Sequence, residues 1–178
     1  MMRTGFIITI CILPLFVFSQ PVNIEYARKQ YFNMSAENCN SLHMMDKFEK
    51  NPPKESVLKA YFGAASAAAP ECVVNPASKL SMFKKGKKLI DQAVKEDPSN
   101  YEIRFLRFAT QDKAPGFLGY NDNLDDDKLF LISNIKKAGA LYGNAFFFKE
   151  MLNFMLNSES VNQKEKKIVK DYLTNTTN

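Results

Sequence analysis

The stretch 75–110, NPASKLSMFKKGKKLIDQAVKEDPSNYEIRFLRFAT, constrains the fold most strongly, because it predicts two consecutive helices with defined ends. Asn75 can accept a hydrogen bond from a backbone N–H at a helix start, and Pro76 needs no donor at the first helical position. Asp97-Pro98 ends this helix, since proline disfavours the helical conformation of the preceding residue. Between these ends, apolar or small residues recur with a 3.6-residue period, at Leu80, Phe83, Gly86, Ile90, Ala93 and Val94.

The second helix of this stretch is apolar on nearly every side. We expect it to run over 101–110, with Ser99 or Asn100 as its cap. Its apolar residues are interrupted only by Glu102, Arg104 and Arg107. Helices that are apolar all round are usually buried, so this segment is predicted to be the central helix of the core.

The remaining chain predicts an all-α fold of about eight helices. The other six helices are expected over 23–34, 39–49, 54–68, 123–138, 145–156 and 161–173. The segment 114–120 is expected to be a loop because it holds a proline and two glycines, yet it also carries two aromatic residues and a leucine. Such a loop either packs over the core, which we favour, or presents a binding surface.

Part of the first stretch resembles the second half of a tetratricopeptide repeat. The resemblance covers about 25 residues and is carried by Gly86, Ile90, Ala93 and Pro98. The small and aromatic residues of the first half of such a repeat would fall at Val74 and Ala77. The resemblance implies antiparallel helix hairpins in a tetratricopeptide-like stack, whose concave face commonly holds peptides or proteins.

A second resemblance and the N-terminus both indicate secretion. The runs KAYFGAASAAAP, PASKLSMFKKGKKLI, EDPSNYEIRFLR and PGFLGY resemble a group of uncharacterised secreted bacterial proteins, which implies no particular activity. Residues 1–19 carry Arg3, then an apolar run over 5–18, which predicts a signal peptide cleaved before Gln20. About 14 apolar residues are fewer than a membrane span needs, although an uncleaved anchor is the alternative. We therefore expect a single secreted or periplasmic domain over 20–178, with no stable membrane insertion after cleavage.

Charge does not indicate nucleic acid. The chain has 24 Lys and Arg against 19 Asp and Glu, and removing Arg3 lowers its formal charge from +5 to +4. This balance is ordinary for a protein of this size. The lysines at 79, 84, 85, 87 and 88 form either a solvated helix face, which we favour, or a surface for an anionic membrane or polymer.

The cysteines and acidic residues do not predict a metal site. Cys39 and Cys72 form either a disulfide or two separately buried thiols. Cys39 lies four residues before His43, but two ligands do not make a metal site. The aspartates over 122–127 lack the glycine and the closing glutamate of a calcium loop. No metal and no cofactor is expected.

Two arginines on the otherwise apolar helix are the strongest candidates for binding. Arg104, Arg107 and Gln111 form a stripe on one helix face. The structural interpretation is ion pairing with Glu55, Glu71 or an aspartate from 122–127. The functional interpretation is a clamp for a carboxylate or phosphate, with Tyr61 or Tyr120 as a wall.

The sequence leaves two main function hypotheses. It contains no recognisable nucleophile arrangement or phosphate loop, so no enzyme is expected. The first hypothesis is a scaffold or partner-binding module for a protein or peptide. The second is a small-ligand binder with an arginine-lined pocket among Phe146, Phe147, Phe154, Tyr120 and the arginine stripe. An open groove with salt-bridged arginines would favour the module, and a closed pocket with unpaired arginines would favour the ligand binder.

Overall fold

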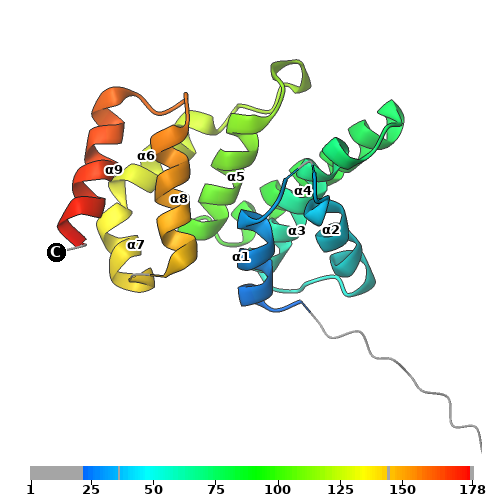
Figure 1. Ribbon diagram of the computed structural model, residues 1–178, viewed down its shortest axis with the longest axis horizontal. Coiled ribbons are helices and arrows are strands. Elements are labelled where there is room, and N and C mark those ends of the chain that lie inside the picture. Colours follow the sequence, from blue (N-terminus) through cyan, green and yellow to red (C-terminus); the bar gives the residue numbers. More distant parts are fainter. Residues whose placement is uncertain (1–21, 36, 144, 177–178) are drawn as a thin grey trace, which may run out of the picture.

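The computed structural model describes residues 22–35, 37–143 and 145–176, and this part of the chain is all-helical (Figure 1). Its nine α-helices are α1 (Ile24–Phe32), α2 (Asn40–Lys50), α3 (Ser56–Ala68), α4 (Pro76–Glu96), α5 (Tyr101–Lys113), α6 (Leu124–Ser133), α7 (Ile135–Tyr142), α8 (Phe146–Asn157) and α9 (Gln163–Thr176). Two 3₁₀ turns, η1 (Ala69–Cys72) and η2 (Gly116–Leu118), lie between them. The all-α prediction is confirmed, whereas the predicted signal peptide over 1–19 lies outside the described residues.

The two helices predicted from 75–110 are present with the expected starts. The Asn75 side chain accepts hydrogen bonds from the N–H groups of Ala77 and Ser78, at 2.9 and 3.1 Å. Asn100, rather than Ser99, caps α5 and accepts from the backbone of residues 102 and 103. Both starts were predictable because each depends on a few residues next to one another in sequence.

Helices α3 and α4 form the most tightly packed pair. A Cβ atom added to Gly86 would lie 2.5 Å from the carbonyl oxygen of Gly63, so the two backbones touch at these glycines. The partner of α4 is therefore α3. It is not the segment at Val74 and Ala77, to which the tetratricopeptide resemblance assigned the first half of the repeat. Neighbouring helices pack in pairs, but no repeated unit is evident among the described residues.

The helix expected over 123–138 is two helices, which gives nine instead of eight. The break lies at Asn134, where the backbone angles are φ −104° and ψ 8°. The Asn134 side chain donates to the carbonyl oxygen of Phe130 at 2.8 Å, and its own N–H bonds the same oxygen at 3.0 Å. The backbone bond is a regular helical one, whereas the side-chain bond uses the same acceptor and competes with the helical pattern. Gly143, with φ +57°, ends α7.

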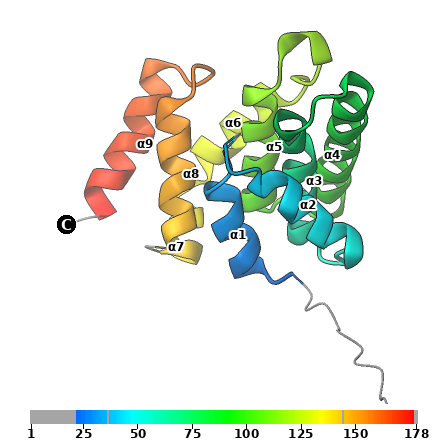
Figure 2. The same ribbon diagram turned by 45° about the vertical axis from the view of Figure 1, so that its right-hand side comes forward.

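Helix α5 lies at the centre of the molecule, as its composition predicts. Figures 1 and 2 show it between α2 to α4 on one side and α6 to α9 on the other. Six of its apolar side chains are buried: Tyr101, Ile103, Phe105, Leu106, Phe108 and Ala109. Phe105 meets Phe154 of α8 edge to face, with ring centroids 5.6 Å apart. Within the described ranges, no helix has the length and hydrophobicity needed to cross a bilayer.

Candidate functional site: an apolar groove beside helix α5

A groove of about 1030 Å³ is lined by several segments that are distant from one another in sequence. It lies among the end of α1, the C-terminal half of α3, the first turns of α4, the end of α5, the η2 loop and α8. The first turns of α4 and the η2 loop project on the same side of the molecule (Figure 1).

The lining of the groove contains two groups of residues: small ones, which we call the floor, and aromatic ones, which we call the walls. Its floor contains Ala64, Ala67 and Ala68 of α3 and Ala109 of α5. The walls include Tyr31, Phe32, Phe83 and Phe154. Because alanine side chains are short, the backbone of a bound segment can come close to the floor while larger side chains contact the walls.

Two exposed apolar side chains stand at the edge of the groove. Phe117 in η2 is 87% exposed, and Leu80 in α4 is 43% exposed. The expectation that the 114–120 loop packs over the core therefore holds for Tyr120, which is buried, and is wrong for Phe117. Leu80 was also expected on the core face of its helix. It points into the groove because α4, at 21 residues, is longer than α3, at 13.

The rest of the groove edge is polar. It includes two lysines and two glutamates, Lys79, Lys113, Glu71 and Glu150. Thr110, Asn153 and Asn157 add groups that can donate or accept hydrogen bonds. An apolar centre with a polar edge is the usual composition of a protein–protein contact surface.

The predicted arginine stripe is held by one buried aspartate. Asp127 is fully buried, and Arg107 donates to its two carboxylate oxygens at 2.6 and 2.9 Å. Arg104 forms an ion pair with the same carboxylate and donates to the Asp126 carbonyl oxygen at 3.2 Å. Burial alone would lower the pKa of Arg107, but the hydrogen bond and charge of Asp127 raise it above its usual value. Ion pairing with an aspartate from 122–127 is therefore the interpretation that the structure confirms.

The other three predicted site residues also lie away from the groove. Tyr61 is buried and donates to Glu102 at 2.6 Å, and Tyr120 donates to Asp91 at 2.9 Å. Burial, with the neighbouring carboxylate as a second cause, raises the pKa of both tyrosines. Gln111 is buried in α5. Neither these residues nor the two arginines line the groove, so the predicted arginine-lined pocket is not assembled there.

A second charged cluster joins α1 to α5. The guanidinium of Arg28 donates from two nitrogens to the two carboxylate oxygens of Glu102, both at 2.8 Å. The hydrogen bond with Glu102 raises the pKa of Arg28. Glu102 also accepts from Tyr61, so this buried carboxylate is satisfied by side chains of two other helices.

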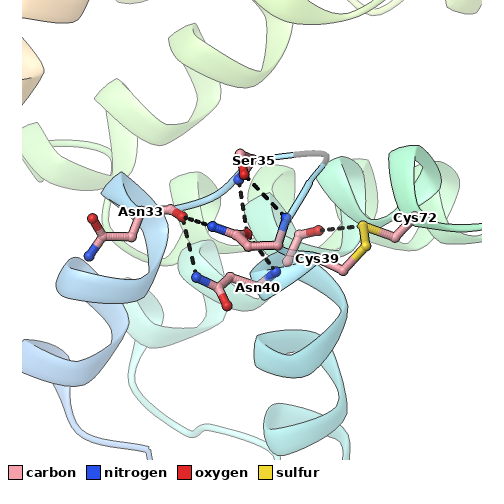
Figure 3. Close-up of a disulfide and its surroundings, with 7 residues drawn as sticks. Asn33, Ser35, Cys39, Asn40 and Cys72 are labelled. Carbon is pink, nitrogen blue, oxygen red and sulfur yellow. Dashed lines mark hydrogen bonds between the residues drawn. A yellow bond between two sulfur atoms is a disulfide. The ribbon is translucent and has the colours of Figure 1, made fainter.

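The structure contains the Cys39–Cys72 disulfide, with Cα atoms 5.6 Å apart (Figure 3). The alternative of two separately buried thiols is therefore wrong. Elsewhere, Asp122, Asp125 and Asp126 are exposed, and the fourth aspartate of that run binds the arginines. The described residues hold no group of three His, Cys, Asp or Glu side chains placed to share a metal ion.

Sequence reasoning missed the groove itself. Its floor was visible only as the alanine-rich end of KAYFGAASAAAP, which high helix propensity explains equally well. The aromatic residues in the 114–120 loop are the one direct signal, and the sequence favours their packing over the core. No protein-family model, curated protein or solved structure matches the chain, so no family is identified.

Proposed function

We propose that this protein is a binding module that holds an apolar helical segment of a partner protein in the groove. The observation that carries the proposal is the groove itself, with its alanine floor, aromatic walls and two exposed apolar side chains, Phe117 and Leu80. Large exposed apolar patches with polar edges mark interaction sites on soluble proteins.

The lining supports an amphipathic helix as the occupant. Such a helix places apolar side chains on one face, where they can enter a groove, and polar side chains along its flanks. The alanine floor allows close backbone approach, and the edge supplies charges of both signs, at Lys79 and Lys113 and at Glu71 and Glu150. These charges complement a helix whose flanks carry both acidic and basic residues.

Fold analogy adds support for a scaffold role. The α3–α4 hairpin has small residues at its contact, as tetratricopeptide hairpins do, and proteins built from such hairpins bind peptides on concave faces. We extend the proposal to a tetratricopeptide-like arrangement on this analogy alone. The proposal includes no catalytic activity, no cofactor and no nucleic acid.

Placement in a secreted or periplasmic compartment also belongs to the proposal. The predicted signal peptide supports it, as does the Cys39–Cys72 disulfide, because disulfides persist in oxidising compartments. The partner would then be another protein of the same compartment.

The alternative of a small-ligand binder receives less support. That hypothesis needed arginines free to hold a carboxylate or phosphate, and Arg104 and Arg107 are both engaged by Asp127. The open groove and the paired arginines are the combination that favours the module.

The test is selection of displayed random peptides on the folded, disulfide-bonded protein, followed by affinity measurement for the enriched sequences. We expect enriched peptides with apolar residues spaced three and four apart. The Leu80→Asp variant should bind them about tenfold more weakly or worse, because it places a charge in an apolar contact. Leu129→Asp is the matched control, since Leu129 is 57% exposed on α6 and does not line the groove. Failure to enrich any helical pattern, or equal binding by both variants, would refute the proposal.

A further inference from the structure

Tyr31 differs from the other uncharged polar residues that line the groove, because its hydroxyl is left unused by the fold. Six such side chains contribute to the lining: Tyr31, Ser35, Ser41, Thr110, Asn153 and Asn157. The polar side-chain groups of the other five all have neighbours within the protein. Thr110, for example, donates to the Leu106 carbonyl oxygen at 2.8 Å. In the part of the chain that the structure describes, the Tyr31 hydroxyl makes no hydrogen bond; the contacts of this side chain are with aromatic rings.

The comparison with Tyr61 and Tyr120 shows what is unusual about Tyr31. Those two tyrosines each donate to a carboxylate, which contributes to their raised pKa. Burial also raises the pKa of Tyr31, but there it acts without a neighbouring carboxylate. The Tyr31 hydroxyl is therefore protonated at neutral pH and can donate a hydrogen bond that the protein itself does not use.

Tyr31 is also held firmly in place. Its ring meets Phe32 and Tyr61 edge to face, with centroids 5.1 and 5.6 Å away. Tyr61 is fixed in turn by its hydrogen bond to Glu102, and the same carboxylate binds Arg28 and so anchors α1 to α5. A group that is already fixed before binding loses little conformational entropy when it binds, so this hydroxyl is well suited to recognition.

The surroundings define the kind of acceptor that Tyr31 can bind. Backbone carbonyl groups inside a helix are already hydrogen-bonded, so a bound helix must supply the acceptor from a side chain. A carboxylate would be costly to remove from water. Glu102, which accepts from Tyr61, is balanced by Arg28, whereas the described contacts of Tyr31 are with aromatic rings. An amide or a hydroxyl costs less to bury, so an uncharged acceptor fits best.

We infer that Tyr31 determines the specificity of the groove by donating a hydrogen bond to an Asn, Gln, Ser or Thr side chain on the apolar face of the bound helix. This inference rests on the proposed function and names the kind of helix that the groove selects. A helix with an apolar residue at that position would leave the Tyr31 hydroxyl without a partner and out of water. Sites built to hydrogen-bond a polar group discriminate against analogues that lack it for this reason.

Peptide selection on the original chain and on Tyr31→Phe tests the inference. We expect peptides selected on the original chain to carry one Asn, Gln, Ser or Thr at a fixed spacing from their apolar residues. Replacing that residue by Leu or Val should weaken binding to the original chain about tenfold, and should change binding to Tyr31→Phe by about twofold or less. Tyr26→Phe is the matched control, because Tyr26 lies on the same helix and does not line the groove. It should keep the original preference.

Three binding results would overturn the inference and leave the binding module intact. These are selected helices with an uninterrupted apolar face, selected helices with Asp or Glu at the polar position, and an equal effect of the peptide substitution on the original chain and on Tyr31→Phe. If neither chain selects a helical pattern, the proposed function fails and the inference fails with it.

The stability of Tyr31→Phe gives a check that does not depend on any peptide. Since the substitution removes no hydrogen bond within the described chain, the variant should unfold at the same urea concentration as the original. A clear loss of stability would show that the fold itself uses the Tyr31 hydroxyl, and would overturn the inference whatever the peptides show.

Discussion

Helix α5 contributes to two regions of the molecule, one in which its charged side chains have partners within the protein and one in which its side chains line a groove open to solvent. Glu102 is buried and Arg104 and Arg107 are largely buried, and all three charges pair with side chains of other helices. At Ala109 and Thr110 the helix contributes to an apolar groove that is open to solvent. Internal ion pairing explains the charges as contacts that hold the helices together, whereas an exposed apolar groove has no such explanation within the described chain. The comparison teaches that the most conspicuous residues of the sequence hold the fold, and that inconspicuous ones line the open groove.

The largest expected effect comes from breaking the Asp127 cluster. Asp127→Ala would leave two largely buried guanidinium groups without their shared carboxylate. Removing one partner from a buried ion pair typically costs about 3–5 kcal/mol, so we expect a loss of this size in the free energy of unfolding. Urea denaturation followed by circular dichroism measures it.

The matched control is Asp125→Ala, on the same helix. Asp125 is exposed and pairs with Lys128, and exposed pairs contribute about 0–1 kcal/mol. Equal destabilisation by the two variants would show that the burial of Asp127 has no energetic weight.

The next effect concerns the backbone contact between α3 and α4. In Gly86→Ala the new methyl group would lie 2.5 Å from the Gly63 carbonyl oxygen, so the two helices must separate. Overpacking of this kind costs about 2–3 kcal/mol, which we expect as a lower free energy of unfolding in the same urea assay.

Gly116→Ala is the control for this substitution. A Cβ at Gly116 would meet nothing within 4 Å, and its φ is not positive, so stability should change by about 0.5 kcal/mol or less. If Gly86→Ala were equally harmless, the close approach of the helices would not be a requirement of the fold.

A smaller effect with a pH signature is expected from Tyr61→Phe. The variant loses the hydrogen bond to buried Glu102, which should cost about 1.5–2 kcal/mol at neutral pH. Burial, followed by the charge of Glu102, raises the pKa of Tyr61 in the folded state above 10.0. Its stabilising contribution is therefore fully present below about pH 10 and is lost as the pH rises through the folded-state pKa.

The stability difference between the original chain and Tyr61→Phe should consequently shrink above pH 10. Paired urea titrations at pH 8, 10 and 11 measure this difference, and the other buried tyrosines cancel because both chains contain them. A difference that stays constant over this range would contradict a raised pKa for Tyr61.

The helices with their paired charges and the apolar groove were not equally predictable from sequence. The ends of α4 and the start of α5 followed from Asn75, Pro98 and Asn100, since capping and proline effects act over a few residues. Pairing of Arg104 and Arg107 with an aspartate was predictable as one of several choices, because buried guanidinium groups require partners. Which aspartate they use depends on how α6 docks against α5, and sequence does not specify that contact.

The groove could not be predicted from sequence for a related reason. Its lining comes from segments that are distant in sequence, and each lining residue has an ordinary local explanation. Alanines in α3 are good helix formers, and Leu80 fits the apolar period of α4. These residues face one groove because α3 and α4 differ in length and because of the path that the η2 loop takes. The Asn134 break was missed because a single asparagine inside a helical pattern is usually tolerated.

The smallest effect on stability, and the sharpest test of the comparison, is expected from Phe117→Ala. Phe117 is 87% exposed, so truncating its side chain should change the free energy of unfolding by about 0.5 kcal/mol or less. The same substitution should weaken binding of a groove-selected peptide about tenfold, because aromatic side chains that a partner covers contribute much of the binding energy. Titration of a labelled peptide and urea denaturation of the same preparation give the two numbers.

Leu141→Ala is the matched control for this last test, because Leu141 is also an exposed large apolar side chain, at 73%, and does not line the groove. The control should retain both stability and peptide binding. A Phe117→Ala variant that lost stability would show that Phe117, like Asp127, stabilises the fold. A variant that kept both stability and binding would remove the η2 loop from the contact surface and confine it to the alanine floor and the walls. Only loss of binding at constant stability separates the residues that hold the fold from those that hold a partner.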